Sequence, residues 1–176
     1  LHAAYGWRVR INLDAAAGST LHPAARAAYE VALDAGWADP QRAHQEGRAA
    51  RALLDDARER VADALGARAD EVAFAPSLGL ALRRAVAGLA IGTARAGERV
   101  VVSAVEHLAV LHACQSLADG WLTPGGRNWA HQQVRVGADG AVDADEFSAA
   151  VLTSPTGFGV LQAANAEVAT RQPVAQ

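Results

Sequence analysis

The most informative absence in this chain of 176 residues is lysine. All 16 basic residues are arginine, whose guanidinium group stays protonated and does not act as an amine nucleophile. No side chain can therefore form an imine with a carbonyl compound, and the N-terminal amine is the one amine that remains. Chemistry that needs such a link must take its amine from outside these residues.

Cysteine and long apolar runs are also scarce. Cys114 is the single cysteine, which excludes an internal disulfide and is typical of the reducing cytoplasm, where we expect the protein to lie. No apolar run approaches the length that crosses a bilayer and no signal-peptide pattern is found, so we expect no membrane partner. The net charge is −3, and the arginines are spread out and balanced by acids, so we expect no nucleic-acid partner.

The residues that are present predict an α/β fold with a mostly parallel sheet flanked by helices, because short apolar runs alternate with amphipathic stretches. The composition, 51% hydrophobic and 20% charged, is ordinary for a globular domain. The predicted strands cover residues 11–13, 72–75, 99–103, 132–136 and 159–162. The predicted helices cover residues 23–36, 44–65, 80–90 and 108–118, with another capped by Asp143. We expect a polar loop after residue 162, and an apolar face on the second helix made of Leu54, Ala57, Val61 and Leu65.

Three predicted strands are followed by residues that suit a ligand. Residues 77–79 open a helix, where free backbone N–H groups and the helix dipole favour a phosphate. Glu106 and His107 follow the next strand, and Asn165 and Glu167 follow the last one. Because ligands of open α/β sheets gather beyond the carboxyl ends of strands, these residues predict a pocket for a flat, phosphorylated heterocycle.

Five motifs occur in the order found in a known family. They are INLDAAAGSTLHP, DPQRAHQEGR, LLDDARERVADALGARADEVAF, SAVEHLAVLHACQSLADG and QAANAEVATRQPV, and together they span residues 11–174. They resemble the N-terminal half of the cysteine desulfurase branch of the class V aminotransferase-like enzymes, which use pyridoxal phosphate. The resemblance implies the N-terminal part of the large domain of a fold type I pyridoxal-phosphate enzyme.

The resemblance also implies roles for individual residues. His107 matches the histidine that stacks on the pyridine ring and can assist proton transfers, and Asn165 matches the asparagine that donates to the phenolic oxygen of the cofactor. Ser77, Leu78 and Gly79 match part of the turn that holds the phosphate.

The chain departs from the family in its phosphate turn and in its extent. Ala75 and Gly79 stand where hydroxyl residues are usual, and Pro76 removes a backbone N–H. The lysine that forms the Schiff base, with its neighbouring histidine, the aspartate facing the pyridine nitrogen and the persulfide cysteine, falls beyond residue 176. The sequence stops where another helix should follow Pro173, so residues 1–176 are expected to be an incomplete domain of this family.

The resemblance therefore predicts the N-terminal portion or subunit of a cysteine desulfurase or C–S lyase, inactive alone. Its partners would be a lysine-bearing C-terminal half or partner subunit, in a homo- or hetero-oligomer, and an amino-acid substrate such as cysteine. The alternative is a non-catalytic scaffold descended from the family, and a third hypothesis is an isolated domain with unrelated small-molecule binding.

A metal site is not expected. Four candidate ligands, His107, His112, Cys114 and His131, have spacings that match no compact metal-binding motif. Cys114 lies on the apolar side of its predicted helix, which favours a place in the core.

Overall fold

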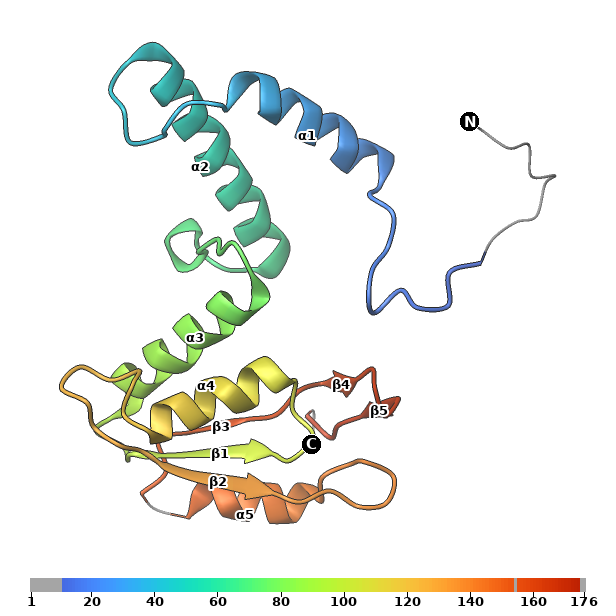
Figure 1. Ribbon diagram of the computed structural model, residues 1–176, viewed down its shortest axis with the longest axis vertical. Helices are drawn as coiled ribbons and strands as arrows, with labels where there is room; N and C mark the ends of the chain where they lie inside the picture. The colour runs from blue at the N-terminus through green and yellow to red at the C-terminus, as the bar shows by residue number, and fades with distance from the viewer. Residues whose placement is uncertain (1–10, 154, 175–176) are drawn as a thin grey trace. The chain divides into compact units, whose positions relative to one another are not determined.

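The computed structural model describes residues 11–153 and 155–174. The chain divides between Ala73 and Phe74 into two compact units, and each is described by itself. Figure 1 labels the elements of both units. No helix in the described ranges combines the length and the apolar character that a membrane span requires.

The first unit consists of helices. Helix α1 (Pro23–Ala35) begins with proline, whose fixed φ suits the first turn, and ends at Gly36. Helix α2 (Gln45–Leu65) ends at Gly66, which adopts the left-handed conformation with φ 66°. A short 3-10 turn, η1 (Ala69–Glu71), follows. Both long helices were predicted from the sequence, and each predicted range differs from the structure by one residue at one end.

Two other expectations for the chain before α3 are wrong. Residues 11–13 form no strand and lead into a turn at residues 15–17, where the Asn12 side chain donates to Gly18 O at 2.9 Å and accepts from Asp14 N at 3.0 Å. Residues 72–75 have no regular structure and pair with no strand in the described part of the chain.

The residues of the apolar face expected on α2 are mostly exposed. Ala57, Val61 and Leu65 are exposed, and Leu54 alone of that set is half-buried. The residues of α2 that are buried are small ones, Gly47, Ala50 and Ala62.

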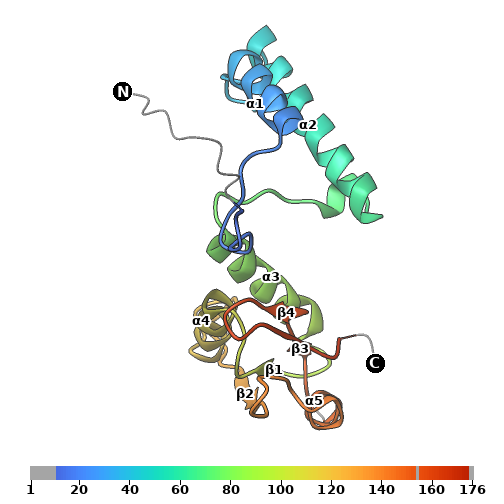
Figure 2. The ribbon, with the colours of Figure 1, turned by 90° about the vertical axis from the view of Figure 1, so that its right-hand side faces the viewer.

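The second unit is an α/β layer structure with a parallel sheet, as predicted. Its elements are α3 (Leu78–Thr93), β1 (Arg99–Ser103), α4 (Leu108–Ala118), β2 (Ala130–Val134), α5 (Ala144–Leu152), β3 (Phe158–Val160), β4 (Ala164–Asn165) and β5 (Thr170–Arg171). The sheet has the order β2-β1-β3, and β1 runs parallel to both neighbours. Figure 2 shows α3 and α4 on one face of this sheet and α5 on the other.

The central strand β1 is buried on both faces, as its unbroken apolar run predicts. Val100 and Val102 pack with Cys114 and Leu117 of α4 in the main core cluster, and all four side chains are 0% exposed. On the other face, Arg99 donates to Ala150 O, at 3.1 Å, near the end of α5. A carbonyl group near the C-terminal end of α5 thereby accepts a hydrogen bond from the guanidinium group of Arg99, and a positive charge is favourable at that end of a helix.

The remaining strands differ in detail from the prediction. Strand β2 lies two residues earlier than the predicted 132–136, and β3 ends at Val160 instead of residue 162. The polar loop expected after residue 162 contains a short antiparallel hairpin, β4–β5. Helix α3 extends beyond the predicted 80–90 at both ends, whereas α4 has the predicted bounds and α5 is capped by Asp143 as predicted.

Candidate functional site

A cavity of about 550 Å³ lies beyond the carboxyl end of β1 in the second unit. Three segments line it: the turn after β1, the first turns of α4, and the chain after β3 that includes β4. Figure 1 shows these segments at the same end of the sheet, with the β4–β5 hairpin beside the start of α4. The lining residues are Ala104, Val105, Glu106, His107, Leu108, Leu111, Gln162, Ala164, Asn165, Ala166, Glu167 and Val168.

His107 is the N-cap residue of α4. Its Nδ1 accepts the backbone N–H of Ala109 at 3.1 Å, which satisfies one of the helix's unpaired donors. A nitrogen that accepts this bond carries no proton, so the neutral ring holds its proton on Nε2. The helix N-terminus thus orients an exposed imidazole at the rim of the cavity.

Asn165 is held by three hydrogen bonds. Its Oδ1 accepts from Glu167 N at 2.8 Å and from Val168 N at 3.1 Å, and its Nδ2 donates to Val105 O at 2.6 Å. An amide NH₂ group has two hydrogens, so one N–H of Asn165 has no partner among the described residues. The side chain is therefore fixed with a donor to spare, in the wall of the cavity that His107 also lines.

The cavity contains two carboxylates of different character. Glu106 is 6% exposed and accepts from the backbone N–H of Gln162, while Glu167 is exposed. Burial raises the pKa of Glu106, and backbone N–H groups of Gln162 and His107 oppose that rise. No lysine or arginine lines this cavity among the described residues, so its polar character is acidic and amide-like.

The predicted phosphate turn lies outside this cavity. Ser77 is the N-cap residue of α3, and its Oγ accepts from Leu80 N at 3.2 Å. Leu78 and Gly79 form the first turn of α3. None of the three lines the cavity of His107 and Asn165, although α3 and α4 begin at the same end of the sheet in Figure 1. The structure thus places His107 and Asn165 in one cavity, and the turn of residues 77–79 does not line that cavity.

Cys114 is a core residue, as its place on α4 predicts. It is 0% exposed, and burial together with the nearby charge of Glu106 raises the pKa of its thiol to about 11. Such a thiol is a poor nucleophile near neutral pH. Across residues 11–153 and 155–174, no three His, Cys, Asp or Glu side chains are grouped so as to hold a metal ion.

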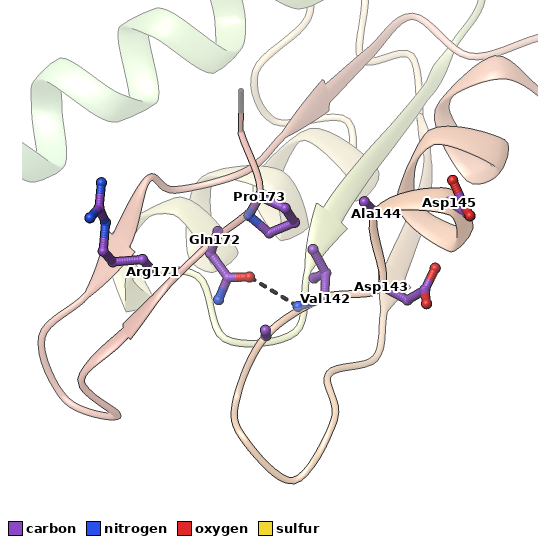
Figure 3. A pocket seen from close by; sticks show the side chains of 8 residues that line it. Val142, Asp143, Ala144, Asp145, Arg171, Gln172 and Pro173 are labelled. Atoms are coloured by element: carbon purple, nitrogen blue, oxygen red, sulfur yellow. Dashed lines mark hydrogen bonds between the residues drawn. The ribbon is translucent and has the colours of Figure 1, made fainter. Parts of the chain in front are cut away.

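A second cavity, of about 560 Å³, lies near the start of α5. Figure 3 shows Gln172 reaching toward Val142 there, while Arg171 and Asp145 point away from one another. Gln172 is 6% exposed, accepts from Val142 N at 2.9 Å and donates to Gly140 O at 2.8 Å. Both ends of its amide are used, so Gln172 has a structural role that the sequence did not indicate.

The profile of the family described as "Aminotransferase class-V" matches residues 11–175. The chain belongs to the class V aminotransferase family. It is 28% identical over 164 residues to "Cysteine desulfurase IscS" of Dictyoglomus turgidum, covering 93% of this chain and 40% of that protein. It is 33% identical over 169 residues to "IscS-like cysteine desulfurase" of Mycobacterium tuberculosis, covering 93% of this chain and 41% of that protein. The chain therefore spans about 40% of the length of these curated relatives.

Solved structures share the fold. A structure described as "NIFS-like protein" superposes with a TM-score of 0.76 at 24% identity, over 94% of this chain and 43% of that one. A second, described as "SspA in complex with cysteine", has a TM-score of 0.73 at 26% identity, over 91% of this chain and 44% of that one. These likenesses agree with the α/β fold of the second unit.

Proposed function

We propose that this chain supplies the ring-holding part of a pyridoxal-phosphate site in a cysteine desulfurase or C–S lyase. His107 stacks on the ring, Asn165 donates to the phenolic oxygen, and residues 77–79 provide part of the phosphate site. The lysine comes from a C-terminal portion or a partner chain, because these residues include none. The observation that carries the proposal is the single cavity that His107 and Asn165 both line.

The residues of the cavity suit such a cofactor. The fixed amide of Asn165 has an N–H to donate, and a phenolic oxygen is an acceptor that this N–H would satisfy. The imidazole of His107 presents a flat, exposed ring, and offset stacking of flat rings is favourable. Ser77 uses its Oγ as an acceptor within α3, so its hydroxyl hydrogen can still be donated to a phosphate oxygen.

Bound pyridoxal phosphate would supply the electron sink for reactions at the α- and β-carbons of an amino acid. The chain's own residues would orient the ring and hold a proton at Nε2 of His107, the nitrogen that does not bond to Ala109. Leu108 and Leu111 line the same cavity and would reduce the access of water to the ring.

The substrate is proposed by analogy with the relatives, whereas the location and the assembly are proposed from the sequence. The curated relatives are described as cysteine desulfurases, and one similar structure as a complex with cysteine, which supports cysteine or a related amino acid as the substrate. Sulfur metabolism in the cytoplasm and a homo- or hetero-oligomer with a lysine-bearing chain complete the proposal. In this reading residues 1–176 are an incomplete domain, inactive alone.

The test is reconstitution. The chain is mixed with a lysine-bearing C-terminal portion of a class V desulfurase and with pyridoxal phosphate, then desalted. The expected result is co-elution of the two chains with near-ultraviolet to violet absorbance from retained cofactor. A counterpart whose lysine is replaced by alanine should assemble but retain much less cofactor. An intact complex without absorbance would refute the proposal.

A scaffold without catalytic function is the second candidate, favoured by the absent lysine and by Ala75, Pro76 and Gly79 in the phosphate turn. It predicts that the two chains assemble and that replacing His107 changes neither their assembly nor any turnover. Loss of turnover without loss of assembly on that replacement excludes the scaffold.

A further inference from the structure

Two consecutive residues at the end of the β1–α4 turn bind the segment that carries Asn165. The carbonyl oxygen of Val105 accepts the side-chain amides of both Gln162 and Asn165. The carboxylate of Glu106 accepts the backbone N–H of Gln162. These three bonds join residues 56 to 60 positions apart in the sequence, so they fix one wall of the cavity against the other.

The burial of Glu106 is costly, because removal from water disfavours its charged form. The side chain is 6% exposed, and no salt bridge among the described residues includes it. A buried carboxylate without a cation is destabilising unless hydrogen bonds replace those of water. The bond that it accepts from the Gln162 backbone N–H is of the charge-assisted kind, which is shorter and stronger than a neutral hydrogen bond.

We propose that Glu106 is a positioning residue, whose carboxylate holds the Gln162 backbone so that Asn165 and His107 face the same ligand. The proposal deepens the proposed function, because a fixed separation of these two side chains matters only if one ligand touches both. His107 follows Glu106 directly, and Asn165 lies three residues after Gln162, so a shift of the Glu106–Gln162 contact displaces both walls.

The contacts of Glu106 favour this role over proton transfer. Its carboxylate accepts the backbone N–H of Gln162, and the backbone N–H groups of Gln162 and His107 lower its pKa, while burial raises that pKa overall. The titratable groups around it are His107, Cys114 on the facing side of α4, and the exposed Glu167 of the same cavity. None of these exchanges a hydrogen bond with the Glu106 carboxylate through its side chain among the described contacts.

The first test uses the chain without cofactor. The chemical shift and exchange rate of the Gln162 amide are measured by NMR against pH, in wild type, Glu106→Gln and Glu146→Gln. Glu146 is an exposed carboxylate in the first turn of α5, so it serves as the matched control. The wild-type and control shifts should titrate with a midpoint above 4.5, the ordinary value for glutamate.

In Glu106→Gln that titration should vanish, and the Gln162 amide should exchange about tenfold faster, the difference between a charged and a neutral hydrogen bond. If the chemical shift of the Gln162 amide does not change with pH in the wild type, the proposal is overturned. This measurement is made on the wild type, so it does not depend on the folding of a variant. An exchange rate equal in wild type and Glu106→Gln also overturns it.

The second test uses the reconstituted complex with pyridoxal phosphate. Glu106→Gln should bind the cofactor about tenfold more weakly, since one bond that aligns the site is weakened, while Glu146→Gln binds as the wild type does. If the wild type binds no cofactor, the proposed function fails while the NMR result still stands. If the wild type binds and Glu106→Gln binds equally well, the positioning role fails alone.

Discussion

Two replacements of His107 separate its role as a helix cap from its proposed role against the ring. Alanine removes both the Nδ1 acceptor and the ring. Asparagine removes the ring but keeps an acceptor, and it is among the best N-cap residues. The backbone at His107, with φ −54° and ψ 136°, is not helical, which is the geometry in which a cap side chain reaches the first turn.

The magnitudes follow from the single bond between Ala109 N and Nδ1, at 3.1 Å. Loss of an N-cap bond costs about 1 kcal/mol of the free energy of unfolding, so His107→Ala should be less stable by that amount. His107→Asn should remain within about 0.5 kcal/mol of the wild type. Both should lose roughly 1 kcal/mol of cofactor binding, near fivefold in affinity, because that is the size of a stacked aromatic contact.

The assay is urea unfolding followed by circular dichroism, together with a cofactor titration of the reconstituted complex. If His107→Ala unfolds at the wild-type urea concentration, the cap bond does not stabilise α4. If His107→Asn binds the cofactor as tightly as the wild type, the imidazole does not stack on the ring. The combination expected here, normal stability with weak binding for asparagine, is one that a purely structural histidine does not produce.

Three further outcomes are expected. Gly157→Ala should destabilise the second unit by about 1–3 kcal/mol in urea unfolding, because a Cβ there would lie 2.5 Å from the Trp129 ring. Gly88→Ala is the control on α3, where a Cβ meets open space, and it should stabilise the unit by up to about 1 kcal/mol. Cys114 should resist a thiol reagent at pH 8 in the folded chain and react after unfolding, because its pKa is about 11 and it is fully buried; fast labelling of folded protein contradicts this. Burial lowers the pKa of His131 below 6.5, and its Nε2 has no hydrogen-bond partner among the described residues, so the unfolded chain takes up the proton more readily. Stability should therefore fall as pH drops below 6.5, and His131→Leu should flatten that slope.

The elements that were predicted from the sequence are those whose signals are local and redundant. Helix α4 has the predicted bounds because Gly120 and the turn after β1 enclose an apolar stretch with helical spacing. Strand β1 was predicted because an unbroken valine run can be buried on both faces of a parallel sheet. Helix α2 was predicted because Gly66 provides the left-handed residue that ends it.

The two strands that were predicted but do not form share a different cause. A strand exists only when a partner strand supplies hydrogen bonds, and the apolar runs at residues 11–13 and 72–75 have none among the described residues. The opposite error concerns the hairpin β4–β5, whose two strands of two residues are too short for a periodic signal. Pairing is a property of distant residues, so short runs do not reveal it.

The sequence predicted that two of the site residues share a pocket, but not how their segments are connected. His107 and Asn165 were predicted to share a pocket because both follow strands of one parallel sheet. The double acceptor role of the Val105 carbonyl was not predictable, because a backbone oxygen has no signature in the sequence. Glu106 was expected beside the ligand because it follows a strand, but its hydrogen bond to the Gln162 backbone N–H was not predictable, because the sequence does not show which distant residue it meets.

Every hydrogen bond that orients His107 and Asn165 is made between residues 105 and 168, within one compact unit. The groups that would hold the ring are thus arranged without the amine that would tether it. Preorganised contacts contribute their full binding free energy when the ligand binds, because the side chains lose no further conformational entropy. Holding the ring and tethering it are then separate free-energy contributions. A complex whose lysine is replaced should therefore still bind the cofactor reversibly. In that complex, His107→Asn should weaken the reversible binding by the same factor as in the intact complex.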